Sequence, residues 1–287
     1  MIDNVTLTAA HKTFVADLKK KGRSISTILA YSKDVSQLFD FIAKDKITSP
    51  QNLTPEQIEN FKTHLSQTNY TAKSVSRKLN SIKTFCRFLI SQGLIQTNPA
   101  VDITHPKYDV KPPRILTKME YRSLRDVCRE DIRLCAIVEL LLQTGIRIGE
   151  LANLTLNDID TDKINIKPYE SHSQREVPLN KAAQVALTTY LKSRPKSRTN
   201  QVFITKTGKP FLIRNIRTAI DRYFKLADIK NAKVNDLRHT FIAHQLESGT
   251  PLTLISKLVG HKRLSTTEKY LLVVKKPDSA PTTLEEL

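Results

Sequence analysis

The chain has 287 residues, of which 46 are Lys or Arg and 28 are Asp or Glu, so its formal net charge is +18. This length suits two domains, and a hydrophobic content of 39% supplies each with a core, which excludes a small disulfide-stapled fold. The excess positive charge predicts a polyanionic partner, with nucleic acid as the first candidate.

The composition along the chain predicts neither a membrane span nor a secretion signal. No apolar stretch approaches the roughly 20 residues that span a bilayer, and the first residues lack a secretory apolar core. We therefore expect a soluble, cytoplasmic protein without a membrane partner. Cys86, Cys128 and Cys135 are odd in number and lack CxxC spacing, which predicts reduced structural thiols and neither zinc nor a disulfide framework. We also expect no cofactor.

Amphipathic helices are predicted in the first hundred residues. The first covers residues 24–44, where apolar side chains recur at helical spacing. Thr54 and Gln57 form a capping box that begins a second helix. A third helix runs from residue 71 to residue 92 and ends at Gly93. These helices predict a helical first domain.

The third predicted helix carries basic side chains outside its apolar stripe. Such a row is typical of a solvated helix face and also of a surface that binds DNA phosphates. After it, residues 106–113 contain three prolines and predict an extended linker whose lysines would follow a phosphate backbone. The candidate DNA-binding residues are Lys73, Arg77, Lys78, Lys83, Arg87, Lys107 and Lys111.

From residue 114 onward the pattern predicts helices around a small sheet. Thr117 and Glu120 form a capping box that begins a helical stretch up to Leu142. The apolar period then changes to two in three segments, residues 164–166, 177–179 and 202–204, which predicts a three-stranded antiparallel sheet. Helices return after residue 180. The predicted fold class is mainly α with a small antiparallel β-sheet in the second domain.

Four side chains of this second half, two arginines, a histidine and a tyrosine, are candidate site residues. Arg147 lies in the phrase TGIRIGEL, Arg238 lies in NDLRHT, His261 follows Val-Gly, and Tyr270 ends the phrase STTEKY. Taken singly, each has an ordinary structural explanation: an ion pair, a helix cap or the packing of a half-buried ring. Their joint occurrence on a strongly basic chain favours the functional interpretation.

The order of these residues, with the phrases LRHTFIAHQLESG and LISKLVGH around them, resembles the tyrosine recombinase or phage integrase family in its simple two-domain form. The resemblance covers nearly the whole chain. It implies a helical, SAM-like core-binding domain over residues 1–105, a linker over 106–113 and a catalytic domain over 114–287. The two domains would close around duplex DNA as a clamp.

The resemblance also implies a role for each residue. Arg147 and Arg238 would neutralise the non-bridging phosphate oxygens through their forked donors, with Glu150 holding Arg147 or its helix start. Tyr270 would attack phosphorus, form a 3′-phosphotyrosyl link and free a 5′ hydroxyl, so that religation needs no ATP and no metal. His261 would donate a hydrogen bond to a phosphate oxygen.

Two positions depart from the family pattern. Asn235 stands where members usually carry a histidine, and an amide orients an oxygen but cannot take a proton. The family's general acid is a lysine in the turn before a segment like Arg-Glu-Val-Pro-Leu, but residues 168–174 contain none, and Glu170 occupies the register position. We expect Lys167 to be the general acid. His172 is the alternative, because the ordinary pKa of histidine, about 6.5, suits proton donation.

The resemblance further implies a homotetramer on two double-stranded recombination sites, which exchanges strands through a Holliday junction. The task is integration or excision of a mobile element, resolution of a transposon cointegrate, or monomerisation of replicon dimers. We expect a simple recombinase, since no arm-binding domain precedes residue 10. The tail after Tyr270 is expected either to dock on a neighbouring protomer or to fray.

A protein of another class remains an alternative. A non-catalytic architectural protein would keep the DNA clamp but lose strand cleavage, and the missing histidine and unplaced lysine motivate it. Retention of both arginines and Tyr270 argues against it.

Overall fold

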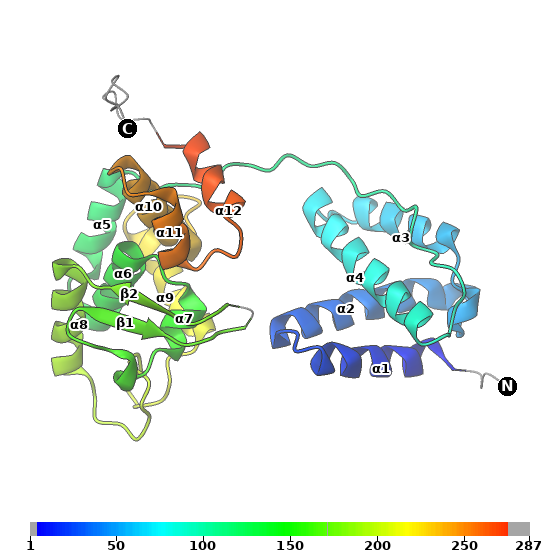
Figure 1. Ribbon diagram of the computed structural model, residues 1–287, viewed down its shortest axis with the longest axis horizontal. Helices are drawn as coiled ribbons and strands as arrows, with labels where there is room; N and C mark the ends of the chain where they lie inside the picture. Colours follow the sequence, from blue (N-terminus) through cyan, green and yellow to red (C-terminus); the bar gives the residue numbers. More distant parts are fainter. Residues whose placement is uncertain (1–4, 171, 275–287) are drawn as a thin grey trace, which may run out of the picture. The chain divides into compact units, whose positions relative to one another are not determined.

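A computed structural model describes residues 5–170 and 172–274, so the tail after Tyr270 lies outside the described residues from residue 275 onward. The chain divides into two compact units, Met1–Val110 and Lys111–Leu287 (Figure 1). The fold is mainly α-helical. None of the helices within the described ranges is long and apolar enough to cross a membrane.

The first unit is built from helices α1 to α4 (Figure 1). Their bounds are α1 Leu7–Lys20, α2 Ile25–Ile42, α3 Pro55–Gln67 and α4 Ala72–Ser91, with short 3-10 turns η1 at Ala43–Asp45 and η2 at Pro50–Asn52. The sequence reading missed α1, although Thr6 caps it and Phe14 and Leu18 lie on its buried face. The capping box at Thr54 and Gln57 forms as predicted.

Aromatic rings join α1, α2 and α4 in the core of this unit. The Phe85 ring lies 5.2 Å from that of Phe14 and 5.6 Å from that of Phe39, both edge to face. Phe14 and Phe85 are fully buried, so these contacts add ring-to-ring attraction to the burial of apolar area. The core therefore holds α4 by its apolar stripe, as the helical spacing predicts.

A buried ionic network on α2 and α4 corrects the predicted basic surface. Lys78 is only 4% exposed, and its ammonium binds the Asp34 carboxylate at 3.0 Å and the Gln37 side chain at 2.6 Å. Asp34 is also buried, and it accepts hydrogen bonds from both terminal nitrogens of Arg77 and from Ser81. Lys78 is thus a partner of a buried carboxylate and does not belong to a DNA-facing surface.

The other predicted DNA-binding residues differ in exposure. Lys73, Arg77 and Arg87 are exposed on α4, whereas Lys83 is half-buried and donates to the Val101 carbonyl at 3.2 Å. Lys107 and Lys111 are exposed in the extended segment that follows.

The second unit contains the remaining helices and a hairpin (Figure 1). Its helices are α5 Lys118–Cys128, α6 Ile132–Thr144, α7 Ile148–Asn153, α8 Lys181–Ser193, α9 Ile213–Leu226, α10 Val234–Glu247, α11 Leu252–Val259 and α12 Ser265–Glu268, with 3-10 turns η3 Leu156–Asp158 and η4 Lys269–Leu272. Helix α6 is buried over most of its surface because α5, α8 and α10 pack around it.

The sheet is smaller than predicted. Within the described residues, strands β1 Lys163–Ile166 and β2 Arg175–Pro178 form a two-stranded antiparallel sheet in which Ile166 pairs with Arg175. The expected third strand at residues 202–204 is wrong. Other partners take its backbone groups. The Val202 N–H donates to the Leu154 carbonyl at 2.8 Å, and the Phe203 carbonyl accepts from the Phe211 N–H at 3.0 Å. The Tyr190 hydroxyl donates to the Val202 carbonyl at 3.1 Å and accepts from the Ile204 N–H at 3.2 Å.

The Asp34 network yields a stability prediction. Asp34→Ala removes the partner of a buried ammonium, so we expect the free energy of unfolding to fall by about 3 kcal/mol or more in urea denaturation. The double variant Asp34→Leu/Lys78→Met removes both buried charges and should recover at least half of that loss. Asp17→Ala breaks a surface pair with Lys21 and should cost less than about 1 kcal/mol. Equal losses for Asp34→Ala and Asp17→Ala would contradict the role of the network.

Candidate active site

The C-terminus of α11 gathers three arginines that are far apart in the sequence. The helix ends at Gly260, whose φ of 67° is left-handed, and its last carbonyls have no partner within the helix. Arg175 Nε donates to the Leu258 carbonyl at 2.6 Å, and Arg238 Nη2 donates to the Val259 carbonyl at 2.7 Å. Arg147 donates to the Val259 and Gly260 carbonyls at 3.1 and 2.8 Å. Positive charge suits this negative end of the helix dipole.

Each arginine is delivered by a different element. Arg147 immediately precedes α7 and has extended backbone angles, Arg175 is the first residue of β2, and Arg238 lies in the second turn of α10. Arg238 also donates to the Gly145 carbonyl, at the end of α6. Gly145 has φ 61°, and an added Cβ would lie 2.3 Å from the Phe241 ring, so the turn that presents this carbonyl requires glycine.

Glu150 is the carboxylate that ties two of these arginines together. Its side chain is fully buried and accepts hydrogen bonds from Arg175 Nη1 and Nη2 at 2.9 and 2.7 Å. It also accepts from the backbone N–H of Arg147 at 2.8 Å and from Arg147 Nη1 at 3.0 Å. Burial alone would raise the pKa of Glu150, but these donors outweigh it and lower the pKa to about 2. The expected role of Glu150 is confirmed for both Arg147 and the start of α7.

The cluster keeps an excess of positive charge. Three guanidinium groups face one carboxylate, so the local sum is 3 − 1 = +2. Burial, followed by repulsion from Arg147, lowers the pKa of Arg238 to about 9, which shows how strongly this position disfavours a cation without a bound anion. Planar forked donors in this arrangement suit a phosphate group.

His261 and Tyr270 lie beside the arginines. His261 Nδ1 shares a 2.8 Å hydrogen bond with the Thr267 hydroxyl. The His261 ring is stacked on the Tyr270 ring at 6.4 Å between centroids. Burial, followed by Arg238 and Arg147, lowers the pKa of His261 to about 3, so this imidazole is neutral at pH 7.

Tyr270 lies in η4 and is 6% exposed. It packs in a small apolar cluster with Phe241, Ile255 and Val259, and its ring also meets His239 edge to face at 5.8 Å. Burial raises the pKa of Tyr270, whereas Arg238 and Arg147 act in the opposite direction. The phenol is therefore within the electrostatic reach of both arginines that the sequence singled out.

The two remaining predicted site residues have different surroundings. Asn235 is exposed in the first turn of α10, one helical turn before Arg238. Lys167 is bound elsewhere: its ammonium pairs with Asp158 Oδ1 at 2.8 Å and contacts the Thr155 hydroxyl at 3.2 Å. Asp158 is buried at the end of η3 and holds this lysine by charge.

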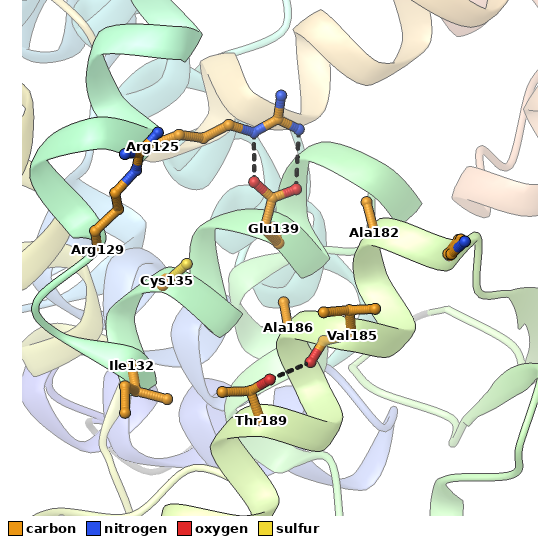
Figure 2. A pocket seen from close by; sticks show the side chains of 10 residues that line it. Arg125, Arg129, Ile132, Cys135, Glu139, Ala182, Val185, Ala186 and Thr189 are labelled. Carbon is orange, nitrogen blue, oxygen red and sulfur yellow. Dashed lines mark hydrogen bonds and ion pairs between the residues drawn. The ribbon is translucent and has the colours of Figure 1, made fainter.

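A cleft of about 850 Å³ opens beside the cluster, between β2 and its preceding loop on one side and the end of α11 on the other. Its lining includes His172, Arg175, Gly260, His261 and Lys262. A separate hollow of about 680 Å³ lies between α5, α6 and α8, where Arg125 turns its guanidinium to Glu139 (Figure 2). The lining of that second hollow contains none of the predicted site residues, and the ion pair occupies its polar wall.

Arg175 is the site residue that sequence reasoning missed. The segment Arg-Glu-Val-Pro-Leu indicates only the register of the preceding turn, without a role for Arg175 itself. Gly260 offered a second signal, because an added Cβ there would lie 2.9 Å from Arg175 Nη1. A basic residue that begins a strand and a glycine that ends a helix become partners only when α11 packs against β2.

Comparison with known proteins identifies the family. Residues 114–276 match the Phage integrase family, and residues 12–93 match the Phage integrase, N-terminal SAM-like domain. The chain is 31% identical over 276 residues to Tyrosine recombinase XerD of Rickettsia bellii, covering 88% of this chain and 90% of the relative. It is 32% identical over 280 residues to Tyrosine recombinase XerC of Oceanobacillus iheyensis, covering 92% and 91%. The chain belongs to the phage integrase family and is a tyrosine recombinase.

Solved structures share the fold. The crystal structure of XerA recombinase is 27% identical, covers 92% of both chains and has a TM-score of 0.52. A lambda integrase dimer bound to a COC′ core site has a TM-score of 0.75 at 18% identity, over 91% of this chain and 97% of the other. The Tn1549 transposon integrase in complex with transposon right end DNA reaches 0.79 at 17% identity, over 96% of each chain.

The depressed pKa of Glu150 predicts how stability depends on pH. Because the folded pKa is below its ordinary value of 4.5, the carboxylate stabilises the fold above pH 4.5, and this contribution is lost as pH falls toward 2. Glu150→Gln should therefore lower the free energy of unfolding by about 3 kcal/mol at pH 6 but by only about 1 kcal/mol at pH 3.

Urea denaturation at a series of pH values measures this difference. Glu176→Gln, at an exposed carboxylate on the neighbouring strand, serves as the control and should change stability by less than about 0.5 kcal/mol at either pH. A cost of Glu150→Gln that does not depend on pH would contradict the assignment.

Proposed function

We propose that this tyrosine recombinase cleaves and rejoins DNA at specific sites through a 3′-phosphotyrosyl intermediate, with Tyr270 as nucleophile. The observation that carries the proposal is the group of three arginines with a residual charge of +2 beside the buried phenol of Tyr270. Phosphoryl transfer depends chiefly on positioning and on neutralising the phosphate oxygens, and this cluster offers both.

Each site residue has its own role in the proposed strand cleavage. Arg147 and Arg238 bind the non-bridging oxygens of the scissile phosphate, and their charge favours the phenolate form of Tyr270 as it attacks phosphorus. Neutral His261 donates from its ring to a phosphate oxygen when the Thr267 hydroxyl donates to Nδ1. Asn235 orients an oxygen but takes no proton. The new bond conserves the energy of the phosphodiester, so religation needs no ATP.

Double-stranded DNA is the proposed partner of both units. In this proposal residues 1–105 form the core-binding domain, 106–113 the linker and 114–287 the catalytic domain. The basic residues of α4 other than buried Lys78, together with those of the linker, contact phosphates. They are Lys73, Arg77, Lys83, Arg87, Lys107 and Lys111. The proposed activity is cytoplasmic.

The proposed assembly is a homotetramer that joins two sites and passes through a Holliday junction. A lambda integrase tetramer bound to a Holliday junction, which shares the fold at a TM-score of 0.74 and 19% identity, supports it. Integration or excision, cointegrate resolution and monomerisation of dimers use the same chemistry, and the target site distinguishes them.

An architectural role without cleavage is the second candidate, and one observation favours it. The Lys167 ammonium is paired with Asp158, and Asn235 stands in place of the usual histidine. The lysine and the histidine that would transfer protons in a family member are therefore paired elsewhere and absent, respectively.

Covalent capture separates the two candidates. A nicked suicide substrate should trap a protein–DNA adduct that survives boiling in detergent, because the cut strand diffuses away before religation. Tyr270→Phe should form none, and Arg147→Ala should form it at least about 100-fold more slowly because the phosphate charge is no longer neutralised. An adduct formed by Tyr270→Phe would exclude this nucleophile, and no adduct with the unaltered protein would favour the architectural role.

Salt dependence tests the DNA-binding surface. For about six neutralised phosphates the slope of log affinity against log salt should be near −5. Lys83→Ala/Arg87→Ala removes two contacts and should make the slope shallower by about 2. Lys19→Ala/Lys20→Ala removes the same charge from the exposed end of α1 and should change the slope by less than half as much. Equal changes for both pairs would show that α4 acts only through net charge.

A further inference from the structure

The loop between β1 and β2 is held against the active site. Tyr169 and His172 pair through their backbones, with N–H to carbonyl distances of 3.1 and 3.0 Å. The Tyr169 ring lies on Gly149 of α7, where an added Cβ would be 2.6 Å from a ring carbon. Arg147 is the N-cap residue immediately before α7, so this contact fixes the loop next to the arginine.

His172 faces the cleft from this loop. It lines the cleft with Arg175, Gly260 and His261. Its Nδ1 is shielded from solvent and has no hydrogen-bond partner among the described residues. The ring therefore lines the cleft, and its Nδ1 forms no hydrogen bond within the protein that a bound group would have to break.

The charged groups around His172 come from every neighbouring element. Arg147 and Glu150 belong to the start of α7, Arg175 to β2, and Lys262 to the turn after α11. Burial, followed by Arg147, lowers the pKa of His172, and Glu150 acts in the opposite direction. A bound phosphodiester adds a negative charge that favours the imidazolium, so the proton donor is formed when the substrate is present.

We propose that His172 is the general acid that protonates the 5′ oxygen leaving the scissile phosphate, a role that rests on the proposed strand cleavage by Tyr270. In the cleavage step the bond from Tyr270 Oη to phosphorus forms as the bond from phosphorus to O5′ breaks. The His172 imidazolium gives its proton to O5′ and becomes neutral. The phenol proton of Tyr270 passes to water, because Asn235 cannot accept it and His261, with a pKa of about 3, is a poor acceptor.

The same groups run religation in reverse. The 5′ hydroxyl attacks phosphorus and returns its proton to His172, while Tyr270 leaves and recovers a proton from water. Lys167 does not compete for this role, because its ammonium is paired with buried Asp158 and contacts Thr155 on the η3 side of the sheet.

A leaving group that needs no proton tests the assignment. Sulfur in place of the bridging 5′ oxygen departs as a thiolate, so loss of the general acid no longer matters. We expect His172→Ala to form the covalent adduct at least about 100-fold more slowly than the unaltered protein on a nicked oxygen substrate. On the 5′-bridging phosphorothioate its rate should lie within about threefold of the unaltered protein.

Matched variants make each outcome decisive. Lys167→Ala should cleave both substrates normally, whereas Arg147→Ala should be slow on both, since the non-bridging charge stays unneutralised. His172→Gln keeps a polar side chain without a transferable proton and should repeat the behaviour of His172→Ala, which separates proton donation from packing of the loop. His172 variants that are normal on the oxygen substrate, or slow on both substrates, overturn the proposal. If instead the unaltered protein forms no adduct on either substrate, the proposed cleavage fails and this proposal fails with it.

Discussion

The end of α11 is the physical constraint on which the site depends. A helix must satisfy its last carbonyls from outside, and here three arginines do so, with Glu150 neutralising part of their charge. This single arrangement fixes the position of β2, α7 and α10 relative to α11. Substitution of Glu150 should also lower the free energy of unfolding, because it leaves buried cations without their partner.

The same arrangement accounts for the reactivity that we propose. Guanidinium groups already held by carbonyls need little reorganisation when a phosphate arrives, and their burial strengthens their attraction for it. The cost appears in the free protein, where Arg238 and His261 both have lowered pKa values. A phosphodiester relieves this repulsion, which links tight binding of DNA to the protonation of groups in the cleft.

Charge on the surface of the first unit is less than its sequence suggests. Asp34 binds Arg77 through both terminal nitrogens and Lys78 through its ammonium, and Lys78 is buried. The charged group of a basic residue on a helix can therefore lie in solvent or pair with a buried carboxylate. Only the packing of α2 on α4 decides between them, and it makes Lys78 a buried partner of Asp34.

The sequence by itself determined the family, the mainly helical fold and four of the residues that surround the site, because helical periodicity and short motifs are local properties. Arg147, Arg238, His261 and Tyr270 could be found because each lies in a recognisable phrase. Tertiary structure alone decided the partners of Arg175 and Lys167. It also decided that residues 202–204 bond to the backbone of Leu154 and Phe211 and to the Tyr190 hydroxyl instead of joining the sheet. These partners depend on which polar groups lie close together once the chain is folded. The spacing of residues along the chain does not determine that proximity.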